Sequence, residues 1–298
     1  MLTRRRFIAI SAALAPSMAL AQTRALHVET GLALGARVTL RLEHPEAPRL
    51  AALAMAEIRR LERVFSLYLP DSDLVRLNRD GRLPEPAFEL LECLAIAGSV
   101  HTASEGRFDP TVQPLWQAEA AAREAGVALS DADRARAKAL IGWTGVRLEP
   151  EAITLNPGMA LTLNGIAQGY IADRVAALLA GHGLTRALID TGEMVALPEG
   201  DWPVRLEAGG SLTLRNRALA TSAPLGMTLG GDGVTSHILD PRSARPVLSP
   251  WRVVSVSAPS AALADALSTA ACLTGDRQSL EALCRAFPSA AVENAVAA

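Results

Sequence analysis

The chain has 298 residues, half of them hydrophobic and 20% charged, which is the composition of an ordinary globular protein and disfavours a disordered chain or a coiled coil. Its formal net charge of −2 disfavours nucleic-acid binding, because proteins of that class carry a marked positive excess. The sequence has no CxxC motif or Cys/His cluster that would indicate zinc. We expect buried free thiols at Cys93, Cys272 and Cys284, with a disulfide between the last two as the alternative.

The first 21 residues have the features of an export signal. A twin-arginine pair within Arg4–Arg6 precedes an apolar run from Phe7 to Leu20, and "ALA" at 19–21 supplies small residues for signal peptidase. The run is too short to span a bilayer, and no cysteine follows it for lipid attachment. We therefore expect a twin-arginine (Tat) signal peptide over 1–21 and a mature periplasmic chain over 22–298 that is not a lipoprotein, with a short membrane anchor as the alternative. Removing the three arginines leaves 26 basic and 31 acidic residues, a net charge of −5.

Taken in chain order, the sequence predicts blocks of helices and strands. A strand region at 28–42 leads into a long helix from near Pro45 to Ser66, and a second helix covers 88–102. A turn-rich stretch at 105–116 follows, and then helical patterns at 131–140 and 168–180. Short alternating runs predict strands at 187–192, 202–208, 218–223, 234–240 and 252–258, before helices at 261–274 and 277–286. Such blocks are typical of a single α+β domain with a mostly antiparallel sheet and packed helices.

Two turn segments could bring a ligand close to the backbone. In "TLNGIAQGY", Gly165 and Gly169 flank the start of a helix, where free backbone groups let a phosphate or a metal approach. In "EGRFDPTVQPLW", a turn at Asp109 lies between Phe108 and Trp116, which offer aromatic surfaces for a flat ring. Each segment can also be an ordinary turn without a ligand.

Two further segments carry titratable groups. "TSHILDPRSARP" places His237, a side chain suited to proton transfer near neutrality, in a predicted strand. A half-buried strand histidine bonded to backbone is the alternative. "LADALSTAA" places Asp265 and Thr269 one turn apart on one helix face, so that their oxygens could meet a hard cation such as Mg²⁺. The alternative is an aspartate stabilised by the helix dipole, with Thr269 bonding back to a carbonyl.

These four segments occur together in one known family. With "FSLYLPDSDLVRLN", "LIDTGE" and "LATSA", the motifs "GRFDPTVQPLW", "LNGIAQGYIADR", "SHILDPRSARPV" and "APSAALADALSTAACLTG" resemble those of the ApbE-type FAD:protein FMN transferases over nearly the whole mature chain. The twin-arginine signal, the chain length and the variant "LNGIAQGY" are most similar to the NosX branch, which is associated with nitrous oxide reductase maturation.

The resemblance implies a T-fold-like domain that binds FAD, cleaves its pyrophosphate with Mg²⁺ and transfers FMN to a Thr or Ser of a partner protein, releasing AMP. In the NosX branch the implied partner is the periplasmic domain of a membrane flavoprotein of the NosR type. The resemblance implies that Asp265, Thr269 and the backbone carbonyl of Gly165 bind the metal and that His237 is the general base. The implied flavin contacts are Leu34, Tyr68, Phe108, Asp109, Thr111, Thr162, Gln168 and Ile238.

Four positions depart from the family pattern. Thr162 stands where the family often has Asp, and Gln168 where it has Lys or Glu, so the flavin-facing side is less charged here. Ala223 and Ala244 replace glycines, and the second replacement affects the expected turn geometry. Two other functions remain open: an FAD pyrophosphatase that gives free FMN and AMP, and a non-catalytic periplasmic FAD carrier or assembly factor, which the less charged pocket fits.

Overall fold

The structure is a computed structural model that describes residues 25–33, 35–207 and 209–298. The predicted signal peptide over 1–21 and the predicted flavin contact Leu34 lie outside the described residues. Within the described ranges, no helix combines the length and the apolar character needed to cross a membrane.

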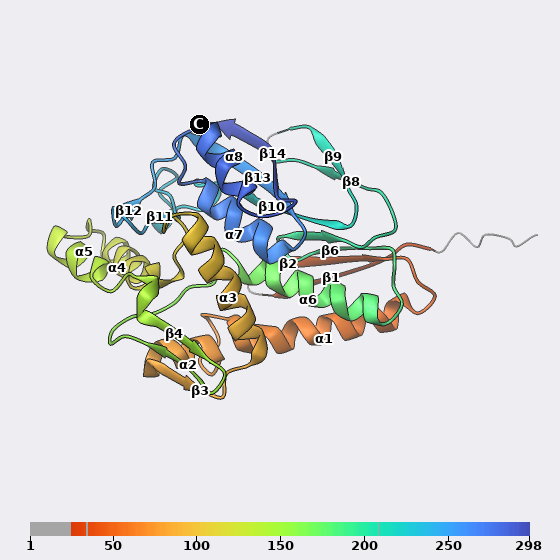
Figure 1. The fold of residues 1–298 in the computed structure, drawn as a ribbon, viewed down its shortest axis with the longest axis horizontal. Helices are drawn as coiled ribbons and strands as arrows, with labels where there is room; N and C mark the ends of the chain where they lie inside the picture. Colours follow the sequence, from red (N-terminus) through yellow and green to blue (C-terminus); the bar gives the residue numbers. More distant parts are fainter. Residues whose placement is uncertain (1–24, 34, 208) are drawn as a thin grey trace, which may run out of the picture.

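A seven-stranded sheet forms the centre of the fold (Figure 1). Its strands run in the order β1-β2-β6-β7-β10-β13-β14, and every neighbouring pair is antiparallel. Alternating burial along β1 shows that one face of this edge strand is open to solvent, as is common in antiparallel sheets. The strands are β1 (His27–Ala33), β2 (Ala36–Leu42), β6 (Ala187–Asp190), β7 (Met194–Ala196), β10 (Arg217–Ser222), β13 (Trp251–Ala258) and β14 (Ala291–Ala297).

Helices cover one face of this sheet (Figure 1). α1 (Ala47–Phe65), α6 (Ala167–Gly181) and α7 (Ala261–Ala271) pack on the strands, and α3 (Phe88–Ala103) packs on α7. α8 (Arg277–Arg285) lies against β14. Because the sheet, α6 and α3 surround α7, nearly all of its residues are buried, including Asp265. The main hydrophobic core lies between this helical layer and the sheet.

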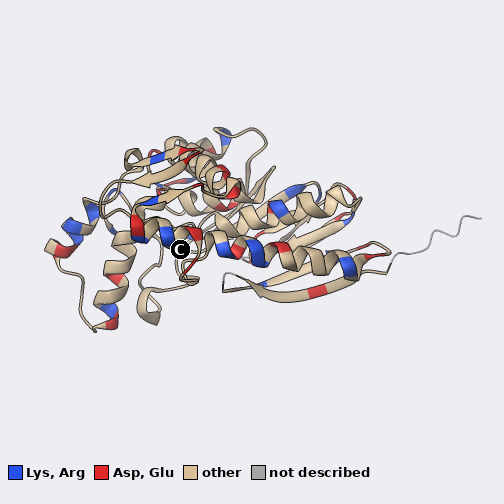
Figure 2. Cartoon of the chain, turned by 90° about the horizontal axis from the view of Figure 1, so that it is seen from below, with Lys and Arg blue, Asp and Glu red and all other residues tan. Residues whose placement is uncertain are grey.

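Smaller units complete the fold around the sheet. The hairpin of β8 (Trp202–Arg205) and β9 (Ser211–Leu214) forms a second hydrophobic cluster with side chains of β6, β7 and β10. α4 (Gln113–Glu124) and α5 (Asp131–Lys138) pack with β11 (Leu239–Asp240) and the turn that follows it to β12 (Arg245–Pro246). α2 (Asp73–Asp80) packs on a small sheet of β3 (Arg82–Pro84), β5 (Ala152–Leu155) and β4 (Val146–Glu149). Three 3₁₀ turns within the described residues are η1 (Pro110–Val112), η2 (Trp143–Gly145) and η3 (Leu229–Gly231). Positively and negatively charged residues are interspersed along the helices (Figure 2).

The structure confirms the predicted α+β class, the single domain, the mostly antiparallel sheet and the packed helices. The three cysteines are free and buried, as expected. The strand predicted over 234–240 is wrong, because only Leu239–Asp240 is a strand. The Ser236 hydroxyl instead donates to the carbonyl of Pro224 at 2.8 Å and accepts the Ile238 N–H at 3.0 Å, which ties this segment to a loop. No helix was predicted over α2, and α4 begins inside the turn-rich stretch predicted over 105–116.

Candidate active site

One cleft of about 390 Å³ gathers side chains from segments that are far apart in the sequence. Its walls come from the turn before α4, the start of α6, the β6–β7 turn, the end of β10 with the loop after it, the segment leading into β11, and α7. Most of the site residues expected from the sequence line this cleft: Phe108, Asp109, Thr162, Gly165, Gln168, His237, Ile238, Asp265 and Thr269. The structure therefore brings these residues together, and their individual roles stay predictions.

The α7 wall carries Asp265, which is 4% exposed. α7 begins where the Ser260 side chain accepts the backbone N–H of Leu263 at 3.2 Å, an ordinary N-cap that sets the helix start. Asp265 is the fifth residue of the helix, and its Oδ2 is buried without a hydrogen-bond partner in the described structure. Burial raises the pKa of Asp265, while the backbone N–H of Gly169 acts in the opposite direction. A purely structural aspartate leaves this oxygen unexplained, because an unpartnered buried oxygen is destabilising.

Thr269 follows Asp265 by one turn and lies against the Gly165 loop. A Cβ atom placed on Gly165 would be 2.9 Å from the Thr269 Oγ1, so the glycine backbone and the hydroxyl are in close contact. The hydrogen bond described for Thr269 links its Oγ1 to the Ser222 Oγ at 3.4 Å, not to a backbone carbonyl. The three residues predicted to bind metal therefore form one corner of the cleft.

Two long-range interactions hold the loop that carries Gly165. The Asn78 side chain of α2 donates to the carbonyl of Leu161 at 2.8 Å and accepts its N–H at 2.7 Å. The backbone N–H of Thr162 donates to the carbonyl of Pro110 at 2.8 Å, which joins this loop to the Phe108–Val112 turn. A main-chain hydrogen bond thus joins two cleft segments that are about 50 residues apart in the sequence.

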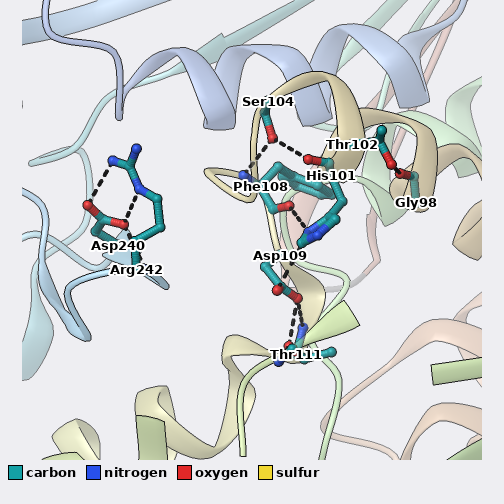
Figure 3. A network of polar contacts seen from close by, with 10 residues as sticks. Gly98, His101, Thr102, Ser104, Phe108, Asp109, Thr111, Asp240 and Arg242 are labelled. Atoms are coloured by element: carbon teal, nitrogen blue, oxygen red, sulfur yellow. Dashed lines mark hydrogen bonds and ion pairs between the residues drawn. The ribbon is translucent and has the colours of Figure 1, made fainter. Parts of the chain in front are cut away.

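The Phe108–Asp109 turn is held by a polar network (Figure 3). The Phe108 N–H donates to the Ser104 Oγ at 3.0 Å, and the His101 Nδ1 lies 3.0 Å from the Phe108 carbonyl and 3.5 Å from the Asp109 Oδ2. The Asp109 Oδ1 accepts the N–H and the hydroxyl of Thr111 at 2.9 and 2.6 Å. Asp109 is 7% exposed and its Oδ1 is thus committed to the turn, which presents Phe108 to the cleft.

Two predicted flavin contacts, Thr111 and Tyr68, are not among the residues that line the cleft. Thr111 is fully buried, and its Oγ1 also accepts the Gly142 N–H at 2.8 Å, so its side chain supports the turn and does not face a ligand. Tyr68 is 74% exposed and is not among the lining residues. Leu34 is outside the described residues.

His237 lines the cleft from the segment before β11. Its Nδ1 is 2.8 Å from the carbonyl oxygen of Met227. Since a carbonyl only accepts, Nδ1 carries the proton in this arrangement, and the lone pair of a neutral ring is then on Nε2. His237 is therefore bonded to the backbone, as the alternative to a proton-transfer role supposed, yet the same side chain also lines the cleft.

The turn after β11 keeps its geometry without glycine. Asp240 accepts the N–H and the guanidinium of Arg242 at 2.9–3.0 Å (Figure 3). Ala244 adopts φ of +53°, a left-handed conformation that glycine enters more easily. The glycine-to-alanine difference at 244 thus places a strained residue in the turn but leaves the turn formed.

Sequence analysis did not single out Arg107, Ser222 or Glu193 as lining residues. Glu193 is 8% exposed, and its Oε2 is buried without a hydrogen-bond partner in the described ranges. Burial raises the pKa of Glu193, and the charge of Asp265 raises it further. An acidic residue in a turn is usually exposed, so nothing in the local sequence indicated that Glu193 is buried. The only signal was its place in the motif "LIDTGE".

The oxygen-rich corner fits a hard cation. No group of three or more His, Cys, Asp or Glu side chains that could hold a metal occurs within the described part of the chain. Mg²⁺ does not need one, since it commonly binds through one or two carboxylates with carbonyl, water and phosphate oxygens. The unpartnered Oδ2 of Asp265, beside the Thr269 hydroxyl and the Gly165 backbone, supplies donors of this type.

The comparisons with known proteins agree with the family expected from the sequence. The model of the ApbE family matches residues 34–292. An FAD:protein FMN transferase from Klebsiella pneumoniae (strain 342) is 31% identical over 233 residues, which cover 72% of this chain and 72% of that protein. The apo structure of the Pseudomonas stutzeri flavinyl transferase ApbE, at 27% identity, matches 88% of this chain and 88% of its own with a TM-score of 0.77.

A flavin transferase ApbE from Vibrio cholerae is 22% identical and shows the same fold, with a TM-score of 0.77 over 90% of this chain and 92% of its own. The family model covers most of the described residues and includes every segment that lines the cleft. The expectation of an enzyme of this kind is confirmed, and the chain belongs to the ApbE family.

Proposed function

We propose that this protein transfers FMN from FAD to a Thr or Ser hydroxyl of a partner flavoprotein and releases AMP. The observation that carries the proposal is one cleft that joins an aromatic turn at Phe108, the oxygen donors at Asp265 and Thr269, and the imidazole of His237. The names of relatives that span most of this chain support the same activity.

The oxygen-rich corner would hold Mg²⁺ through Asp265, Thr269 and the carbonyl of Gly165. When bound, the ion would neutralise negative charge on the pyrophosphate. Lower negative charge favours both attack at phosphorus and departure of AMP. Phe108 faces the cleft from a turn that the hydrogen bonds of Asp109 fix, so it offers a fixed surface for the flavin ring.

His237 is the group proposed to accept the proton of the acceptor hydroxyl. The hydroxyl oxygen forms a bond to the phosphorus of the FMN half, the bond from that phosphorus to the oxygen of AMP breaks, and the hydroxyl proton passes to Nε2. The proton then leaves to solvent or to the AMP phosphate. Because Nδ1 is held by the carbonyl of Met227, the ring presents Nε2 in one orientation.

His237 also borders a second hollow, which α4 and the 227–230 loop form beside the cleft. Trp116, Arg123 and Met227 are among its lining residues. The same imidazole thus lies at the junction of two hollows, one for FAD and one from which an acceptor segment reaches the ring. This arrangement favours transfer to a second protein over binding of FAD alone.

The cellular setting belongs to the same proposal. The Arg4–Arg6 segment and the apolar run after it support Tat export to the periplasm, where the protein is not a lipoprotein. The variant "LNGIAQGY" supports the NosX branch, a NosR-type membrane flavoprotein as acceptor, and a role in nitrous oxide reductase maturation.

A mass measurement tests the activity. The purified protein is incubated with FAD, Mg²⁺ and the soluble periplasmic domain of the acceptor, and we expect the acceptor to gain the mass of one FMN while AMP appears. An acceptor without its reactive Thr, replaced by Val, is the control and should gain nothing. Free FMN and AMP without labelling would show an FAD pyrophosphatase, and intact bound FAD would show a carrier; either result contradicts the proposal.

A further inference from the structure

Glu193 is a buried carboxylate for which the mechanism above has no use. It lies between β6 and β7, where the N–H of Thr191 donates to the Glu193 carbonyl at 3.0 Å and Gly192 adopts φ of +106°. This tight turn directs the side chain into the cleft, where only 8% of the residue is exposed. Among the described residues, its Oε2 has no hydrogen-bond partner. A buried oxygen without a partner destabilises the fold unless a bound ligand interacts with it.

Glu193 and Asp265 share the same unusual environment. Each lines the cleft, each is more than nine-tenths buried, and each has one oxygen without a partner. One backbone N–H lies beside each carboxyl group, that of Thr221 for Glu193 and that of Gly169 for Asp265. The Thr191 hydroxyl, in the turn that carries Glu193, donates to the Gln168 carbonyl at 2.9 Å, which ties this turn to the start of α6, the helix that packs on α7 and Asp265.

No side-chain cation compensates these two carboxylates within the described ranges. Neither forms an ion pair with a described Lys, Arg or His. Arg107, which lines the same cleft, donates instead to the Ser104 carbonyl at 2.9 Å and pairs with Glu105 at 3.0 Å. A cation from outside the protein would supply the positive charge that the described side chains do not provide. Carboxylate and hydroxyl oxygens select a hard divalent cation in preference to a softer metal.

We propose that Glu193 is a second carboxylate ligand of the divalent cation that Asp265 binds. The inference rests on the proposed function, because it assigns a further residue to the metal corner of that cleft. Two carboxylates neutralise the charge of one divalent ion. With one carboxylate alone, one positive charge would remain until the FAD pyrophosphate neutralised it. The cation consequently binds before FAD and without it.

Cation binding without flavin tests this assignment. Mn²⁺ alone is titrated into the full, FAD-free protein, and the free ion is followed by its electron paramagnetic resonance signal. The wild type should bind about one ion, and Glu193→Gln should weaken binding about tenfold or more. Glu207→Gln is the matched control, because Glu207 lines the same cleft but is exposed; its Mn²⁺ affinity should not change. Equal affinity of Glu193→Gln and wild type, or no binding by the wild type, overturns the inference.

Thermal stability separates a ligand from a structural residue. In EDTA, Glu193→Gln should melt at the wild-type temperature or above it, because the variant removes a buried charge. Addition of Mg²⁺ should raise the melting temperature of the wild type and Glu207→Gln, and raise that of Glu193→Gln much less. A variant that is less stable in EDTA and gains the full Mg²⁺ shift would show that Glu193 only supports the fold. Glu193→Asp, which keeps the charge, should recover part of the shift.

The acceptor-labelling assay is read separately. A wild type that binds Mn²⁺ through Glu193 but labels no acceptor would refute the proposed function and leave the two-carboxylate site intact. A wild type that labels its acceptor while Glu193→Gln binds Mn²⁺ normally would refute only the role of Glu193.

Discussion

The Asp173 carboxylate on α6 accepts the backbone N–H of Ala261, the first residue of α7, at 2.7 Å. The same carboxylate accepts the N–H of Ala262 at 2.9 Å, so a side chain of one helix satisfies the free N-terminal groups of the other. Gly169 lies at this junction, two residues into α6 and beside the buried Asp265. The α6–α7 contact therefore positions the metal corner of the cleft.

Gly169→Ala should separate the two helices. A Cβ atom at this position would lie 2.2 Å from the Ala261 carbonyl oxygen and 2.7 Å from the Ala262 nitrogen, and both are backbone atoms that cannot move alone. We expect a loss of about 1–3 kcal/mol in the free energy of unfolding and a loss of Mn²⁺ affinity, measured by urea denaturation and titration. Gly181→Ala at the end of α6 is the control, because its Cβ meets nothing within 4 Å. Normal Mn²⁺ binding by Gly169→Ala would contradict the positioning argument.

Asp173→Asn should change how stability depends on pH. Burial raises the pKa of Asp173 from 3.8 to about 6, while the N–H groups of Ala261 and Ala262 oppose the shift. The folded protein therefore holds a proton that the unfolded chain releases, so this group's contribution is complete below about pH 4 and is lost as the pH rises through about 6. Urea denaturation between pH 4 and 7 should show wild-type stability falling relative to Asp173→Asn over this interval. Parallel curves would contradict the assignment.

The parts of the fold that the sequence predicts are those whose residues carry their own local signal. α7 has a Ser260 cap and continuous helical periodicity, so its start and the shared face of Asp265 and Thr269 are predictable, whereas its end was predicted three residues too late. α2 is only eight residues long and strongly polar, and no helix was predicted there. β14, "AVENAVA", has small side chains and a weak alternation, and its strand depends on pairing with β13.

The residues of the site also differ in whether a local sequence signal reveals them. His237 and Asp265 were predicted because a histidine or an aspartate in apolar surroundings is conspicuous in the sequence. Glu193 could not be recognised in this way, since its burial arises only when the β6–β7 turn meets β10 and α7 in space. Thr111 was placed on the flavin from its motif, yet its hydroxyl is consumed by Asp109 and Gly142, which no local pattern reveals.

Thr111→Val should destabilise the turn that presents Phe108. The substitution keeps the shape of the side chain but leaves the half-buried Gly142 N–H without its acceptor and removes a donor to Asp109. We expect the free energy of unfolding to fall by about 1–3 kcal/mol, measured by urea denaturation. Thr111→Ser keeps the hydroxyl and should retain most of the stability together with FAD affinity. A Thr111→Val protein that is fully stable but fails to bind FAD would show that Thr111 contacts the flavin directly.

His237→Asn should abolish transfer and preserve binding. The Asn side-chain amide can still donate to the Met227 carbonyl in place of Nδ1, but it lacks the Nε2 lone pair that is proposed to accept the hydroxyl proton. At saturating FAD and Mg²⁺ the single-turnover rate of acceptor labelling should fall by about 10²–10⁴-fold, while FAD affinity by fluorescence and Mn²⁺ affinity stay at the wild-type level. His182→Asn, at an exposed histidine after α6, is the control and should label normally. If His237→Asn labels the acceptor at the wild-type rate, another group must accept the proton; if it loses FAD, the ring serves binding.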